Sequence, residues 1–121
     1  MLRVDNVEGK GRGVFADRRF AKGELIERAP VAVVPTCQWY YIEKTLLVDY
    51  CYCWEDEMAV AFGRIMILNH SYCPNAYYEK RLEDRIIELV ALCDIEDGEE
   101  ILVNYNGDPA DDSPVWFEVK D

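Results

Sequence analysis

The sequence predicts a mostly β domain, and three observations support this fold class. Many short apolar runs are rich in β-branched and aromatic residues, and turn-forming residues separate them. No long stretch has the apolar period of an amphipathic helix, which argues against a doubly wound nucleotide-binding fold. Half of the 121 residues are apolar, which is enough for one core. We therefore expect a single domain over residues 1–121.

The first elements are expected to be strands. Residues 12–16 read as a short strand, and residues 24–28 and 31–34 read as two more. Proline has no N–H to donate to a strand ladder. Pro30 and Pro35 are therefore expected at sheet edges or strand ends.

The middle of the chain holds the best helix candidate, residues 36–47. Residues 49–54 and 58–62 read as two strands around the acidic turn 55–57, and residues 63–68 form a short apolar run.

The last third predicts a long β-branched strand over 85–95, a turn over 96–100 and a return strand over 101–105. The apolar and aromatic segment 113–119 is expected to fold back onto the domain.

The net charge of −11 limits the classes of partner. Nucleic-acid binding rests on basic residues that neutralise phosphates, so direct nucleic-acid binding is not expected. An acidic surface instead favours a cationic partner, although the same charge also serves solubility. There is no signal-peptide layout and no apolar run of membrane-spanning length. A cytoplasmic protein without membrane contact is the expectation.

The five cysteines do not predict a disulfide framework or a metal site. Their number is odd, and no pair has the spacing of zinc ligands. Cys51 and Cys53 are expected on one face of a strand, because residues two apart point to the same side. We expect both thiols to be packed there.

Three groups of residues are candidates for a functional site. The glycines of GKGRG (9–13) allow close approach of a ligand, or simply form a turn before a strand. The segment NHSYCPN (69–75) holds the only histidine, His70, which either satisfies buried backbone groups or acts chemically. Tyr50 and Tyr105 end strand-like runs, where a phenol either lines a channel or packs at an edge.

Taken together, three segments resemble the SET domain of protein-lysine methyltransferases. GRGVFA (11–16) resembles the glycine motif of that family, NHSYCPN its NHSCxPN motif, and GEEILVNY (98–105) its closing strand. Their order and rough spacing also agree. The size is similar to that of the short viral and bacterial members.

The resemblance implies a β-clip fold of several small twisted sheets with short helices, in which the C-terminal segment threads through a loop near NHSYCPN. It implies S-adenosylmethionine as the cofactor, with no metal. It also implies a structural role for Asn75. By resemblance, the residues that contact the cofactor are Gly11, Arg12, Gly13, Asn69, His70, Tyr105 and Trp116.

The resemblance implies a transferase, a protein-lysine N-methyltransferase, in which Tyr105 and Tyr50 line the catalytic channel. The partner would be a lysine-rich protein, histone-like or ribosomal, and a homodimer is plausible by analogy with small viral members. Tyr72 stands where the family motif has cysteine, and Gly63-Arg64-Ile65 departs from its Gly-aromatic-Gly pattern. Two alternatives remain: a catalytically silent SET-like module that binds proteins, and an acidic structural or inhibitor domain.

Overall fold

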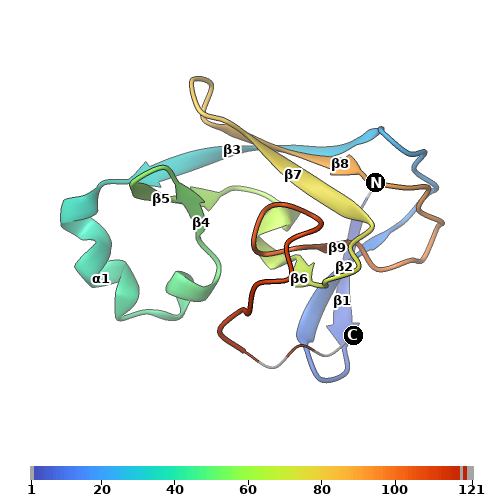
Figure 1. Cartoon of the computed structure of the whole chain (residues 1–121), viewed down its shortest axis with the longest axis horizontal. Coiled ribbons are helices and arrows are strands. Elements are labelled where there is room, and N and C mark those ends of the chain that lie inside the picture. Colours follow the sequence, from blue (N-terminus) through green and yellow to red (C-terminus); the bar gives the residue numbers. More distant parts are fainter. Residues whose placement is uncertain (1, 118, 120–121) are drawn as a thin grey trace.

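The computed structural model describes residues 2–117 and 119, and it is built from three small sheets (Figure 1). The predicted mostly β class with short helices is confirmed. The N-terminal sheet is an antiparallel pair of β1 (Leu2–Val7) and β2 (Gly11–Ala16). The central sheet has the order β4-β5-β3-β8-β7, and β6 pairs with β9 in parallel. The remaining strands are β3 (Leu25–Val34), β4 (Tyr52–Trp54), β5 (Glu57–Ala61), β6 (Asn69–His70), β7 (Ala76–Arg81), β8 (Ile86–Ala91) and β9 (Leu102–Val103).

β3 is one long strand where the sequence predicted two. Its first half pairs with β8 and its second half with β5, and the change of partner falls at Pro30. The placement of Pro30 at an edge was therefore wrong, although the physical reason for it still applies. The Pro30 carbonyl accepts from Phe62 N at 2.9 Å, and the missing N–H falls where the pairing passes between neighbours. Pro35 directly follows the strand, as expected.

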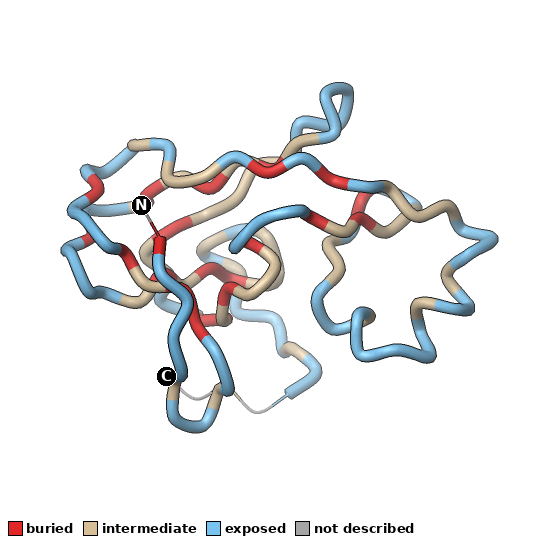
Figure 2. The backbone as a smooth tube through the Cα atoms, turned by 180° about the vertical axis from the view of Figure 1, so that it is seen from behind, coloured by how far each residue is buried: buried red, intermediate tan, exposed pale blue. Residues whose placement is uncertain are grey.

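The predicted helix over 36–47 is broken into short pieces: the 3₁₀-helices η1 (Thr36–Gln38) and η2 (Leu46–Asp49), with the one-turn α1 (Trp39–Glu43) between them. Thr45 separates α1 from η2, because its hydroxyl donates to the Ile42 carbonyl and accepts from Leu47 N. None of the three helices buries a residue, and Figure 2 shows the segment as a largely exposed loop.

Three of the predicted strands, 49–54, 85–95 and 101–105, are shorter than expected, and one apolar run is helical. The predicted hairpin around the acidic turn is present as β4 and β5. Residues 64–67 of the apolar run form the 3₁₀-helix η3 (Arg64–Ile67). β8 ends at Ala91, and Ile95 then forms an isolated antiparallel bridge with Phe20. The return strand is reduced to β9, whose partner is only two residues long.

The core is formed by buried residues of all three sheets and their connections, and β6 and β9 contribute the buried His70 and Val103. The largest fully buried side chains come from several sheets and their connections: Phe20, Ile65, Ile87, Leu89, Ile95, Ile101, Val14, Val103 and Asn104. The parallel pair sets Asn69 beside Leu102 and His70 beside Val103. Two distant motifs of the sequence are thereby held side by side.

Asn75 fixes that arrangement. Its amide nitrogen donates to Glu99 Oε2 at 2.9 Å and to the Glu100 carbonyl at 2.8 Å, while its oxygen accepts from Leu102 N at 2.8 Å. These contacts agree with the structural role implied for Asn75. The threading of the C-terminal segment through a loop stays a prediction.

The cysteines in the described residues are all free thiols. Packing of both Cys51 and Cys53 was expected, and this is wrong for Cys53, which is exposed. Cys51 is partly buried, and burial raises the pKa of its thiol. Within the described part of the chain, no group of three or more metal-ligating side chains is found. Nor is any described helix long and apolar enough to cross a membrane.

Candidate active site

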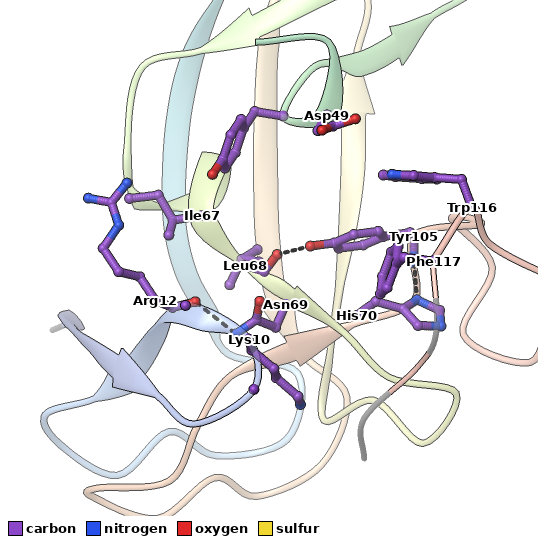
Figure 3. Close-up of a pocket in the computed structure, with 13 residues that line it drawn as sticks. Lys10, Arg12, Asp49, Ile67, Leu68, Asn69, His70, Tyr105, Trp116 and Phe117 are labelled. Carbon is purple, nitrogen blue, oxygen red and sulfur yellow. Dashed lines mark hydrogen bonds between the residues drawn. The ribbon is translucent and has the colours of Figure 1, made fainter. Parts of the chain in front are cut away.

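Tyr105 is held at both ends by the residues around NHSYCPN (Figure 3). Its backbone N–H donates to His70 Nδ1 at 2.9 Å, and its phenol donates to the Leu68 carbonyl. Because Nδ1 accepts this bond, it carries no proton there, an assignment that follows from the hydrogen bond. The only histidine therefore positions the backbone of Tyr105. His70 also lines the pocket described below, so its contact with the cofactor stays a prediction.

Asn69 is oriented by two hydrogen bonds that its amide nitrogen donates. One goes to the Arg12 carbonyl at 2.9 Å and the other to Glu100 Oε2 at 2.8 Å. Both N–H groups are thus used, and the amide oxygen lies on the side that faces Leu68 (Figure 3). Asn69 therefore presents an acceptor to the space beside Tyr105.

The two glycines of GRG have different roles. Gly11 has a φ of +83°, which favours glycine, and it lines the cleft described below. Gly13 lies behind the cleft wall, where an added Cβ would stand 2.5 Å from Glu100 Oε2 and 3.0 Å from Asn69 Nδ2. The absence of a side chain at Gly13 allows β2 to pack closely against the Asn69–Glu100 pair, while its contact with the cofactor stays a prediction.

The C-terminal segment returns to the site. The Ser113 carbonyl accepts from the Tyr72 hydroxyl at 3.1 Å and from Asn106 Nδ2 at 2.8 Å. Trp116 then stacks on Tyr105, with ring centroids 5.7 Å apart and an angle of 21° between the planes. The predicted return is confirmed for this part, while residue 118 of the predicted segment lies outside the described residues.

These groups surround a cleft of about 400 Å³, which we call the first pocket. Every predicted site residue lines it except Gly13. Its full lining is Gly9, Lys10, Gly11, Arg12, Asp49, Tyr50, Ile67, Leu68, Asn69, His70, Tyr105, Trp116 and Phe117. The lining combines two basic side chains near the glycine loop with aromatic rings at the other side (Figure 3).

A second pocket of about 200 Å³ shares part of its wall with the first. The residues common to both are Asp49, Tyr50, Leu68, Tyr105 and Trp116. The rest of its lining is Cys51, Tyr52, Cys53, Ile65, Met66, Tyr78, Lys80, Asn106 and Gly107. Tyr105 therefore stands between two adjoining cavities of different size.

Two tyrosines of the second pocket were not predicted as site residues. The rings of Tyr52 and Tyr78 meet edge to face at 5.0 Å. The Tyr52 phenol donates to the Ile65 carbonyl at 2.5 Å, and the Tyr78 phenol donates to the Tyr105 carbonyl at 3.5 Å. The available signal for Tyr52 was its two-residue spacing from Tyr50 in YCY, whereas nothing near Tyr78 in the sequence marked it.

Three phenols of the site have a raised pKa. Burial, with a smaller contribution from neighbouring groups, raises the pKa of Tyr105 and of Tyr78 to about 12. Burial likewise raises the pKa of Tyr52 far above its usual value. These side chains therefore act as hydrogen-bonding groups and as walls, and none is poised to remove a proton near neutral pH.

The two pockets adjoin at a wall in which hydrogen bonds fix the position of Tyr105. This arrangement suits an enzyme that transfers a group from a donor in one pocket to an acceptor in the other pocket. The family model described as the SET domain matches residues 11–106. This match spans most of the sequence, so the chain belongs to the SET domain family, as its three motifs indicated.

Two similar proteins carry names that refer to activity. The chain is 32% identical over 119 residues to "Histone-lysine N-methyltransferase, H3 lysine-37 specific" of Schizosaccharomyces pombe. The aligned region covers 97% of this chain and 77% of that protein. It also resembles the crystal structure of a Plasmodium falciparum protein named as a candidate histone methyltransferase. That likeness has a TM-score of 0.70 and 28% identity, and it covers 86% of this chain and 91% of the other.

Proposed function

We propose that this protein is a protein-lysine N-methyltransferase that moves a methyl group from S-adenosylmethionine to a lysine of a basic protein. The observation that carries the proposal is the shared wall of the two pockets, in which Tyr105 faces both. The larger pocket is the donor site and the smaller one is the acceptor channel. Membership of the SET family and the name of the yeast relative support the same reaction.

The residues of the first pocket fit the chemistry of S-adenosylmethionine. Lys10 and Arg12 bring cations to one side, where a carboxylate would be neutralised. The Asn69 oxygen is an oriented acceptor because its nitrogen is already engaged. Trp116 and Phe117 offer aromatic faces for a purine ring. Bound there, the cofactor supplies a methyl group on a positively charged sulfur.

The second pocket fits the side chain of an acceptor lysine. Its wall carries the rings of Tyr50, Tyr52, Tyr78 and Tyr105, which suit an apolar stem with an amine at its end. The amine must lose its proton before it attacks the methyl carbon, and a free lysine has a pKa of about 10.4. Desolvation by these rings disfavours the ammonium form, as does the nearby positive sulfur.

The proton can then pass to water without a dedicated base. His70 Nδ1 is occupied by the Tyr105 N–H, and the pKa of the Tyr105 phenol is about 12. A cofactor held in the first pocket beside Lys10, Arg12 and Asn69 would supply the methyl group to the amine, and its sulfur would keep the electron pair of the broken carbon–sulfur bond. The protein therefore contributes alignment and exclusion of water.

The partner we propose is a basic protein such as a histone. The charge of −11 attracts cationic surfaces, and the yeast relative is named for a histone lysine. Ribosomal proteins have the same chemistry and belong in the first substrate panel.

The test is radiolabelled methyl transfer to histones and ribosomal proteins, with the wild type and Tyr105→Phe. The variant keeps the ring that stacks on Trp116 but loses the hydroxyl at the shared wall. We expect transfer to fall at least tenfold, about 1.4 kcal/mol of transition-state stabilisation. Tyr41→Phe is the matched control, because Tyr41 is 70% exposed and lines neither pocket.

Two results would contradict the proposal. One is wild-type protein that neither binds S-adenosylmethionine in a calorimeter nor labels any basic protein, which would favour the silent binding module. The other is normal turnover by folded Tyr105→Phe, which would remove the role assigned to the phenol.

A further inference from the structure

Lys80 is a basic side chain in an unusual place for this acidic protein. It lies on β7, two residues after Tyr78, so the two side chains project from the same face of the strand. Both line the second pocket, and Lys80 Nζ stands 5.9 Å from the centre of the Tyr78 ring. Lys80 lines the second pocket but not the first, so it belongs to the part of the channel lining that the two pockets do not share.

Two arginines near Lys80 are engaged in ion pairs, whereas Lys80 has no carboxylate partner among the described residues. On the opposite face of β7, Arg81 pairs with Glu79 at 3.0 Å and with Glu88 at 2.6 Å. Arg28 also pairs with Glu88, at 2.7 Å. In a chain with 24 acidic and 13 basic residues, a lysine left without an acidic partner beside an aromatic channel is available to an outside anion.

The lining of the second pocket therefore carries charges of both signs. Asp49 lies in the wall shared with the first pocket, and Lys80 lines the other part. To meet a donor in the first pocket, an acceptor lysine has to bring its amine to the shared wall, which includes Asp49. The residue beside that lysine in the substrate then lies nearer to Lys80. A carboxylate there is attracted by the Lys80 ammonium, and a second cation is repelled.

We propose that Lys80 selects substrates in which an aspartate or glutamate lies next to the methylated lysine. The inference rests on the proposed function and adds a rule of local sequence. The substrate protein is basic as a whole, which favours encounter with an acidic enzyme, but it carries a carboxylate beside its target. The ligand of Lys80 is thus a side-chain carboxylate of the substrate.

The test uses peptides made around a histone lysine that the wild type is found to methylate. At each position from two before to two after that lysine, the residue is varied among Glu, Gln and Lys, and kcat/KM is measured for each peptide. For wild type, we expect Glu to exceed Lys at one position by roughly two- to fivefold, the range for an exposed ion pair. Lys80→Glu should reverse that ratio, and Lys80→Gln should bring it near one.

Lys22→Glu is the matched control. It changes the net charge by the same amount, but Lys22 is an exposed residue that lines neither pocket. Its peptide preference should equal that of the wild type. Thermal unfolding of all variants checks that the fold is retained, and the conservative Lys80→Gln carries the test if Lys80→Glu is unstable.

The outcomes separate this inference from the proposed function. Methyl transfer with the same Glu-to-Lys ratio in wild type and both Lys80 variants overturns the role of Lys80 alone. A reversal by Lys22→Glu as well shows an effect of net charge and also overturns it. Failure of the wild type to label any histone or ribosomal protein overturns the proposed reaction, and this inference falls with it.

Discussion

Substitution of Gly13 by alanine adds one carbon atom behind the first pocket. That Cβ would stand 2.5 Å from Glu100 Oε2, 2.7 Å from Val7 Cγ2 and 3.0 Å from Asn69 Nδ2. Non-bonded carbon contacts are comfortable at about 3.5–4.0 Å, so the Glu100 carboxylate has to move by roughly 1 Å. Such a shift stretches the 2.8 Å hydrogen bond that holds the Asn69 amide.

The expected cost has two parts. Overpacking of this kind typically removes about 1–3 kcal/mol from the free energy of unfolding. Loss of a hydrogen bond to a charged group removes about 1.5–3 kcal/mol, part of which is the same strain counted again. Because Asn69 also loses its fixed orientation, we expect S-adenosylmethionine to bind at least tenfold more weakly, about 1.4 kcal/mol.

Gly23→Ala is the matched control. Gly23 has a φ of +86° and an added Cβ there would meet nothing within 4 Å. Alanine at positive φ costs about 1–2 kcal/mol, a comparable loss of stability away from the site. Urea unfolding compares the stabilities, and calorimetry compares the binding of S-adenosylmethionine. If Gly13→Ala binds the cofactor as tightly as Gly23→Ala, the packing argument for Gly13 is refuted.

Three further predictions concern stability and partner binding. Asn75→Ala should lower the free energy of unfolding by about 1–3 kcal/mol, because the Leu102 N–H, the Glu99 carboxylate and the Glu100 carbonyl lose their partner. Urea unfolding measures this, and an unchanged midpoint would contradict it. The folded pKa of about 12 for Tyr78 and Tyr105 exceeds the unfolded value of about 10, so the unfolded state loses protons first and stability should fall between pH 10 and 12. Chemical denaturation at pH 9 and 11 measures this, and equal stability would refute it. Added salt should weaken binding of a basic substrate protein, since screening acts on exposed charges, and salt-independent binding would remove the role of the −11 charge.

The sequence was informative where the site depends on local backbone. NHSYCPN and GEEILVNY mark turns and polar contacts whose residue types are visible in one short stretch, and their residues do meet around Tyr105. The glycines of GRG also predicted a close approach. For Gly13, the group that approaches is the Asn69–Glu100 pair of the protein itself.

The second pocket, which we propose as the acceptor channel, could not be predicted in the same way, because the register of the paired strands creates it. Tyr78 reaches the site through the pairing of β7 with β8, and Tyr52 through the pairing of β4 with β5. These contacts depend on long β3, which pairs with both β5 and β8. We predicted a break at Pro30 because proline cannot donate a hydrogen bond to a neighbouring strand. This rule concerns pairing with one partner strand, and it does not predict a strand that changes its partner at the proline.

The position of Tyr105 explains how a site without a dedicated base could be sensitive to many substitutions. His70 holds its backbone, the Leu68 carbonyl holds its hydroxyl, and Trp116 covers its ring. Each contact fixes a different part of one side chain that borders both pockets. In the proposed reaction, a change in any of these contacts would shift donor and acceptor relative to each other, and the rate of an in-line transfer depends steeply on that alignment.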